Sequence, residues 1–288
     1  MFHENAAEWS LPYDTPPDVE RLFVTVSPGR QLSALRWGRA KPAVVLLHGG
    51  AQNAHTYDTV ALSLRRPILA VDLPGHGHSD AAPGGMGDVV GHARDVVEAL
   101  RALGIERVPL VGMSLGGLVA LRVAATAPDV VDRLGMIDIT PGLTPEKSGH
   151  ITAFVNGPRT FPSLEELVAR TVEHNPTRSE SSLRRGVLHN AMQLDDGTWM
   201  WRHQRFEPPS DVRSLDAAAL WDELSVVRAP ILLVRAMGHG SVVDDEDEAE
   251  FRRRQPSATI VHVADSGHSV QGDQPLVLAD VLASFLDR

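Results

Sequence analysis

Short continuous runs of apolar residues recur along the chain and alternate with longer segments of helical periodicity. A continuous apolar run is typical of a strand that is buried on both faces of a sheet. Most runs end in a turn rich in glycine or polar residues, and a helical segment follows. The runs lie at residues 42–47, 68–73, 108–111, 131–139, 231–234 and 259–263. This alternation predicts an α/β fold in which a mostly parallel, twisted sheet carries helices on both faces.

The N-terminal segment does not follow this alternation. Residues 20–26 and 32–37 flank Pro28-Gly29, which predicts an antiparallel hairpin. Residues 1–18 contain three prolines, so we expect an extended arm over the surface. Helices between the later strands are expected at about residues 55–64, 88–103, 115–125, 216–224 and 245–254, and another from residue 275.

The alternation of strands and helices breaks between residues 141 and 213. This part has no buried-strand run but several segments that we interpret as helical. They include a capping box at residues 163–166, the segment 182–192, and the aromatic and basic stretch Trp199-Met200-Trp201-Arg202. We therefore predict that residues 141–213 form a helical cap, inserted into an α/β core of residues 1–140 and 214–288.

Composition and charge narrow the class of partner. The 288 residues include 27 basic and 37 acidic side chains, a formal net charge of −10, which argues against nucleic acid and anionic membranes as partners. The absence of cysteine excludes disulfides, a thiolate nucleophile and a zinc–cysteine site. There is no signal-peptide pattern and no apolar stretch long enough to span a membrane, so we expect a cytoplasmic protein. No feature of the sequence indicates an oligomeric state.

One turn carries the clearest catalytic pattern. The strand at 108–111 leads through Gly112-Met113-Ser114-Leu115-Gly116 into a helix, and this is the G-x-S-x-G pattern of a nucleophile elbow. Glycine is needed two residues on either side of the serine, because a Cβ there would collide with the neighbouring strand or helix. The turn exposes the Ser114 hydroxyl. It also directs the Leu115 amide and the helix N-terminus toward an anion formed beside that hydroxyl.

Three further motifs accompany the elbow in a fixed order. His48-Gly49-Gly50 follows the first buried strand, a loop at residues 72–79 follows the second, and Gly267-His268 follows the last. Together the four motifs resemble the α/β-hydrolase fold family in its cap-bearing branch, from about residue 20 to the C-terminus except the cap. The resemblance implies that Ser114 is the nucleophile and His268 the general base. It also implies that the backbone amides of Gly50 and Leu115 form the oxyanion hole.

The acid that would orient His268 has two candidates. Most members of the family carry an aspartate shortly after the strand equivalent to residues 231–234, but residues 235–241 contain no carboxylate here. Asp244 comes next, in an acidic run that also suits a helix N-terminus. Asp138 lies at the carboxyl end of an earlier strand, where certain lipases, haloalkane dehalogenases and lactone hydrolases carry their acid. An unpaired carboxylate would be costly in that apolar run, so Asp138 is the favoured acid and Asp244 the alternative.

The leading functional hypothesis is a serine hydrolase that cleaves a carboxylic ester or lactone through an acyl-enzyme, without a cofactor or metal. Relatives that open epoxides or displace halides carry aspartate as the nucleophile, so Ser114 argues against both. The alternatives are a hydrolase of carbon–carbon bonds in vinylogous diketones, a cofactor-independent dioxygenase-like enzyme, and a non-catalytic ligand receptor. We expect a small apolar substrate in the cap. The candidate pocket side chains are Phe154, Met192, Trp199 and Trp201.

Overall fold

An eight-stranded sheet forms the centre of the computed structural model, which describes residues 1–175, 178–205 and 216–288. Its strand order is β1-β2-β4-β3-β5-β6-β10-β11. The strands are β1 (Val19–Val26), β2 (Arg30–Trp37), β3 (Val44–Leu47), β4 (Ile68–Val71), β5 (Val108–Met113), β6 (Val131–Ile137), β10 (Ile231–Ala236) and β11 (Thr259–Val263). Within this sheet of the described chain, only β1–β2 and β2–β4 pair antiparallel, so the predicted hairpin and the mostly parallel sheet are confirmed.

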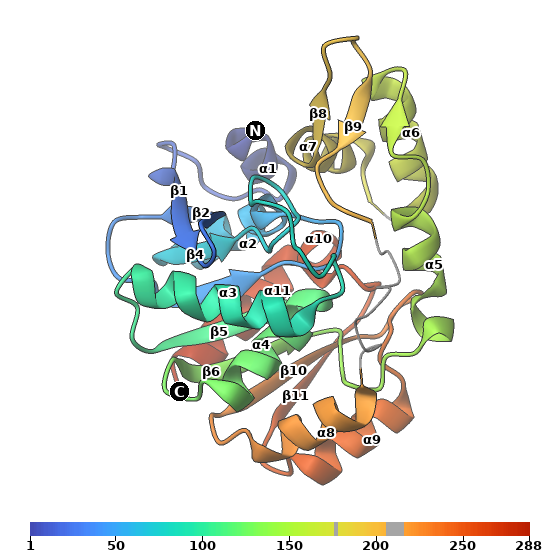
Figure 1. The fold of residues 1–288 in the computed structure, drawn as a ribbon. Coiled ribbons are helices and arrows are strands. Elements are labelled where there is room, and N and C mark those ends of the chain that lie inside the picture. The colour runs from blue at the N-terminus through green and yellow to red at the C-terminus, as the bar shows by residue number, and fades with distance from the viewer. Residues whose placement is uncertain (176–177, 206–215) are drawn as a thin grey trace.

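Helices cover both faces of this sheet (Figure 1). The helices of the core are α2 (Asp58–Leu64), α3 (Val89–Ala102), α4 (Leu115–Thr126), α8 (Ala217–Val226), α9 (Asp245–Arg254), α10 (Val270–Asp273) and α11 (Pro275–Leu286). Side chains of α3, α4, α8 and α9 pack in one apolar cluster with one face of the sheet, and those of α2 and α11 pack with the other. The inner strands β3, β4 and β10 are therefore shielded from water on both sides, whereas the edge strands β1 and β11 keep exposed positions.

Strand β3 shows why the apolar runs are continuous. All four of its side chains are buried. Val45 and Leu47 belong to one of the two apolar clusters, whereas Val44 and Leu46 belong to the other. Because successive side chains of a strand point to opposite faces, a strand between two helical layers needs an apolar residue at every position.

The N-terminal segment differs from its prediction. Residues Phe2–Glu8 form helix α1 rather than part of an extended arm. The Phe2 ring packs on Trp37 of β2 with 5.0 Å between ring centroids, and Asn5 and Ala6 are buried. The three prolines all follow this helix, so they do not interrupt it. The expectation of an extended arm over residues 1–18 was therefore wrong for its first half.

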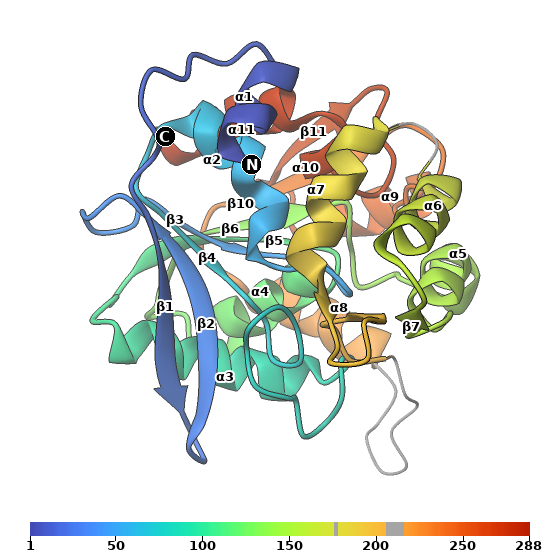
Figure 2. The same ribbon diagram turned by 90° about the horizontal axis from the view of Figure 1, so that it is seen from above.

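The part of the chain predicted as a cap combines helices with a small sheet (Figure 2). Its elements are α5 (Pro145–Val155), α6 (Leu164–His174), α7 (Glu180–Asn190), β7 (Thr160–Phe161), β8 (Ala191–Gln193) and β9 (Trp199–Trp201). The stretch at Trp199 forms the central strand of the order β7-β9-β8, so its helical interpretation was wrong. Trp201 packs with Phe161 and Leu167 in a separate apolar cluster. The predicted boundary between residues 213 and 214 lies outside the described residues.

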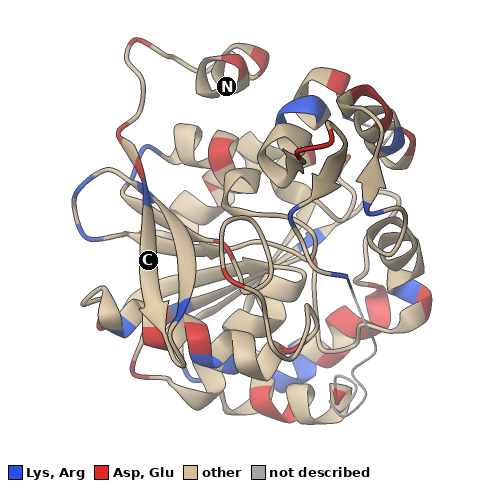
Figure 3. Ribbon diagram, turned by 45° about the horizontal axis from the view of Figure 1, so that its top comes forward, with Lys and Arg blue, Asp and Glu red and all other residues tan. Residues whose placement is uncertain are grey.

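Acidic and basic side chains are interspersed over the outer helices (Figure 3). The arginine run at the end of α9 is one example, since Arg253 and Arg254 both pair with Glu250 of the same helix. None of the helices in the described parts of the chain is long and apolar enough to cross a membrane.

Candidate active site

The turn between β5 and α4 holds Ser114 in a backbone conformation that L-residues seldom adopt. Its φ and ψ angles are +51° and −120°. A Cβ at Gly112 would lie 2.0 Å from the carbonyl oxygen of Gly116, and a Cβ at Gly116 would lie 2.4 Å from that of Leu47. The first contact is with the following helix and the second with strand β3. These clashes explain why glycine flanks the serine on both sides.

Asp138 and His268 meet at the carboxyl edge of the sheet. Nδ1 of His268 lies 2.8 Å from Oδ2 of Asp138, whose side chain is fully buried. The carboxylate also accepts hydrogen bonds from the amides of Ala236 (2.9 Å) and Val242 (3.2 Å) and from the Ser241 hydroxyl (2.7 Å). Four donors therefore fix this carboxylate, and they orient it toward the imidazole.

Ser114 lies at the same edge of the sheet as this pair. Strands β5 and β6 are neighbours, and the Ser114 amide donates to the carbonyl of Ile137, the residue before Asp138 (3.2 Å). Nε2 of His268 is buried and has no hydrogen-bond partner among the described residues. The imidazole thus has one nitrogen held by a carboxylate and the other available for a proton.

Asp244 lies in a different environment. It is the N-cap of α9, where its side chain accepts from the amide of Asp247 (2.9 Å) in a capping box. Its carboxylate also forms an ion pair with Lys147 (2.7 Å). These contacts occupy Asp244 in holding α9 to the start of α5, and the contact with His268 is made by Asp138.

The loop after β3 lies against the serine. A Cβ at Gly49 would be 3.3 Å from Cβ of Ser114. His48 braces this loop, because its Nε2 accepts from the Leu73 amide (2.9 Å) and its Nδ1 therefore donates to the Gly49 carbonyl (2.7 Å). In the described part of the chain, the amides of Gly50 and Leu115 donate no hydrogen bond. Both are free to donate to an anion.

Burial lowers the pKa of His48 to about 4. The pKa of a histidine in an unfolded chain is about 6.5, so between these pH values the unfolded chain binds a proton that the native protein does not. Stability therefore falls as the pH decreases. We expect His48 alone to remove up to about 3 kcal/mol between pH 7 and pH 4.

Urea denaturation at several pH values tests this expectation. His48→Asn, which binds no proton, should start from a lower stability but lose less of it on acidification. Equal pH dependence of the wild-type protein and the variant would contradict the assignment of this acid sensitivity to His48.

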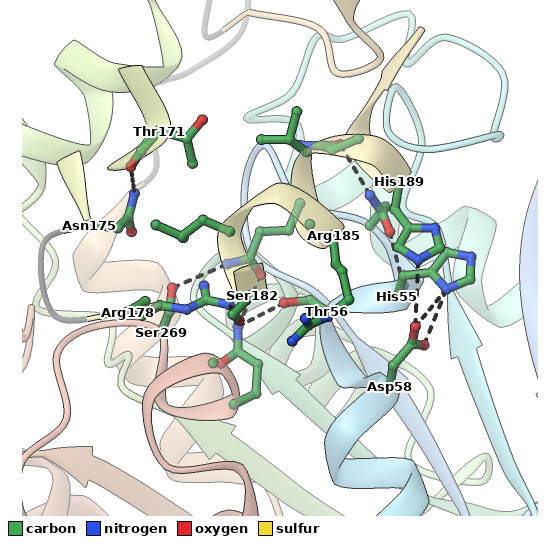
Figure 4. A pocket seen from close by; sticks show the side chains of 18 of the residues that line it. His55, Thr56, Asp58, Thr171, Asn175, Arg178, Ser182, Arg185, His189 and Ser269 are labelled. Carbon is green, nitrogen blue, oxygen red and sulfur yellow. Dashed lines mark hydrogen bonds and ion pairs between the residues drawn. The ribbon is translucent and has the colours of Figure 1, made fainter. Parts of the chain in front are cut away.

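A cavity of about 170 Å³ lies between α7 and the core (Figure 4), and neither Ser114 nor His268 is among its lining residues. Its wall includes Ala51 and Gln52, which closely follow Gly50, and Ser269, which follows His268. Of the four predicted pocket side chains, Phe154 and Trp201 line this cavity. The other two, Met192 and Trp199, lie on β8 and β9 and are not among its lining residues.

One group of side chains in the described residues has metal-ligand chemistry. His55, Asp58 and His189 place their ligand atoms within 4.8 Å of one another at one end of this cavity. The two imidazoles stack face to face, with 3.6 Å between centroids and 12° between planes. Two stacked rings do not direct their nitrogens in-plane at one point, and Asp58 already binds Nδ1 of His55 at 2.9 Å. The arrangement of His55 and His189 is therefore that of two stacked rings and not that of two metal ligands.

Two residues that contact the candidate site, Ser241 and Gln52, were not predicted from the sequence. Ser241, which donates to Asp138, lies in the segment where the carboxylate is missing. Gln52 links the loop after β3 to the loop that carries His268, because its Oε1 accepts from the Gly49 amide (3.1 Å) and its Nε2 donates to the Ser269 hydroxyl (3.3 Å). A hydroxyl near the usual acid position and an amide just after His-Gly-Gly were the signals that could have revealed them.

Comparison with known proteins shows relatives along almost the whole chain. The esterase Rv0045c of Mycobacterium tuberculosis is 44% identical over 279 residues, which are 94% of this chain and 90% of the relative. A solved structure of this esterase, from work on its transition metal inhibition, has a TM-score of 0.84 and 40% identity. The alignment covers 100% of this chain and 97% of the chain of the esterase. The sn-1-specific diacylglycerol lipase ABHD11 of Mus musculus is 28% identical over 85% of this chain and 81% of the lipase.

The family itself is also identified. Residues 44–281 match the alpha/beta hydrolase family, and this range contains the elbow and the Asp138–His268 pair. The resemblance inferred from the four motifs is therefore confirmed. The chain belongs to the alpha/beta hydrolase family.

Proposed function

We propose that this protein is a serine esterase that cleaves a small carboxylic ester through an acyl-enzyme on Ser114. The observation that carries the proposal is the His268 imidazole at the sheet edge that also carries the elbow, with Nδ1 on a buried carboxylate and Nε2 unpartnered among the described residues. This is the arrangement that a general base for a serine hydroxyl requires. The 44% identity to a mycobacterial esterase supports the same reaction class.

The proposed reaction begins when the Ser114 hydroxyl attacks the ester carbonyl. His268 accepts the hydroxyl proton on Nε2, and Asp138 stabilises the imidazolium that forms. The carbonyl oxygen becomes an oxyanion, to which the amides of Gly50 and Leu115 donate. The tetrahedral intermediate then collapses, and the alcohol leaves with the proton from His268.

Water completes the proposed cycle. His268 removes a proton from a water molecule, which attacks the acyl carbon and forms a second oxyanion in the same position. The bond to Ser114 then breaks, and the serine oxygen recovers its proton from the imidazolium. The products are a carboxylic acid and the free enzyme.

A substrate panel tests the ester assignment. We expect turnover of short 4-nitrophenyl esters, with saturation kinetics, and slower turnover of simple lactones. A protein that hydrolyses lactones or vinylogous diketones but leaves every ester in the panel intact would contradict the proposal. Binding without turnover of any of them would instead favour the non-catalytic receptor.

A further inference from the structure

The cavity between α7 and the core holds a cationic side chain that is only partly satisfied. Arg178 donates from Nη2 to the Ser182 hydroxyl at 3.0 Å, whereas its Nε is buried and has no partner among the described residues. Within the described residues, no ion pair joins its guanidinium to a carboxylate, and Asp273 and Glu8 act on it only from a longer distance. An arginine remains charged at every physiological pH, so a buried guanidinium without a close anion is costly.

Neighbouring charges of the cavity are paired, and this sets Arg178 apart. Arg185, one to two helical turns further along the chain, binds Glu8 and also donates to the Asn5 side chain (2.6 Å). At the other end, Asp58 binds His55. Asp273 is a nearby carboxylate, and it accepts from the Gly267 amide (2.9 Å) beyond ion-pair distance of the guanidinium. Among these charged groups of the described chain, Arg178 is the cation that lacks a close counter-ion.

The guanidinium lies beside the loop that carries the catalytic histidine. A Cβ at Gly272 would be 2.7 Å from Cζ of Arg178, so the absence of a side chain in α10 makes room for it. Figure 4 shows Arg178 next to Ser269, the residue after His268. Gln271 lines the same part of the cavity with its Oε1 buried and unpartnered among the described residues. The Gln271 oxygen is an acceptor, so the free donor that could bind an anion between α7 and α10 is Nε of Arg178.

We propose that Arg178 binds a carboxylate on the acyl chain of the substrate, so that the preferred substrates are monoesters of dicarboxylic acids. This inference rests on the proposed esterase function and adds the substrate class. A carboxylate supplies the planar acceptor pair that the guanidinium fork matches. The acyl chain, rather than the alcohol, suits the recess because it stays on Ser114 after the alcohol has left. Phe154 and Trp201 provide apolar wall for its methylene groups.

Matched esters test the proposal. The probes are 4-nitrophenyl hydrogen esters of the dicarboxylic acids from succinate to suberate, each compared with the neutral ester of the same chain length. We expect the wild-type protein to prefer at least one of the anionic esters. Arg178→Met should lower kcat/KM for that ester by about 10- to 100-fold, mainly through KM, and change the neutral esters by less than about threefold. Arg178→Lys should retain part of the preference, because it keeps the charge but loses the fork.

Arg184→Gln provides the matched control. Arg184 lies on α7, its side chain is 42% exposed, and it pairs with Glu165 on the cap surface, so its loss should leave both series unchanged. Competitive inhibition of neutral-ester hydrolysis by the free dicarboxylates gives a second measurement on the wild-type protein, which remains informative even if Arg178→Met does not fold.

Two results would overturn the proposal. One is a wild-type protein that prefers no anionic ester and is not inhibited by dicarboxylates. The other is an equal loss of kcat/KM for anionic and neutral esters in both Arg178→Met and Arg178→Lys. That result would mean that the arginine holds α7 against α10 and does not bind the substrate. Absence of turnover on every ester would contradict the proposed esterase function instead. Dicarboxylate binding, measured directly by calorimetry, would then still decide whether Arg178 holds the anion.

Discussion

Replacing Ser114 by alanine is expected to lower kcat for 4-nitrophenyl butyrate by about five to six orders of magnitude. The alanine removes the oxygen that attacks the ester, and no neighbouring group in the proposed mechanism can replace it. Rate above that in water would come only from the oxyanion donors and from substrate binding. Steady-state kinetics on carefully purified protein, with wild-type contamination excluded, measures this loss.

The same position offers a control for folding. Alanine has the same Cβ as serine and must adopt the same φ of +51°, so Ser114→Ala should unfold at nearly the wild-type temperature. Ser114→Gly should be more stable by about 1 kcal/mol, because glycine adopts this conformation without strain. If Ser114→Ala were inactive and also unfolded, the loss of rate would reflect the loss of structure. If it were fully active, Ser114 would be excluded as the nucleophile.

Replacing Asp138 by asparagine is expected to reduce kcat by about 10³- to 10⁴-fold. Asparagine keeps the size of the side chain, but its amide cannot stabilise the His268 imidazolium or hold the same tautomer. Its NH₂ group would also face some of the donors that the carboxylate now satisfies, Ala236 N, Val242 N and Ser241 Oγ. Kinetics together with thermal unfolding separates the catalytic loss from any loss of stability.

Asp244→Asn is the matched control for this prediction. Asparagine is as good an N-cap as aspartate, so α9 should keep its start, and only the ion pair with Lys147 is lost. We expect kcat within about twofold of wild type, and stability lower by about 1 kcal/mol or less. If Asp244→Asn lost several orders of magnitude while Asp138→Asn kept the full rate, the assignment of the acid would be reversed.

The order of elements in the core could be predicted because a strand buried on both faces appears in the sequence as a continuous run of apolar residues. The four residues Val44–Leu47 are all apolar since both of their faces are covered, and the four residues of β4, Ile68–Val71, follow the same rule. The need for glycine at positions 112 and 116 could also be predicted from the sequence, because it depends on the backbone of one local turn.

Elements at the edges of the fold were missed because their stability comes from particular contacts. Helix α1 is short, and it is held by the packing of Phe2 on Trp37, which no local pattern reveals. The strand Trp199–Trp201 was interpreted as helical, although Asp196-Gly197 just before it is a turn signal. Three residues are too few for an alternating pattern to dominate.

A candidate site residue could be proposed from the sequence wherever a motif fixes it, whereas the choice stayed open wherever the partners are distant in the chain. Ser114 and His268 stand in motifs. The choice between Asp138 and Asp244 depends on which carboxylate reaches His268, 130 residues along the chain from Asp138. The proposed role of Arg178 could not be predicted for the same reason, since the lack of an ion pair at its guanidinium among the described residues is a property of the folded cavity.

The most direct test of the account is labelling with a fluorophosphonate, which reacts with an activated serine. We predict one adduct per chain, located by peptide mass spectrometry on Ser114, with loss of esterase activity in proportion to labelling. Ser114→Ala should take up no label, and Asp138→Asn should take it up far more slowly than Asp244→Asn. A folded, ester-hydrolysing protein that is not labelled, or that is labelled at another residue, would contradict the assignment of Ser114 as the nucleophile.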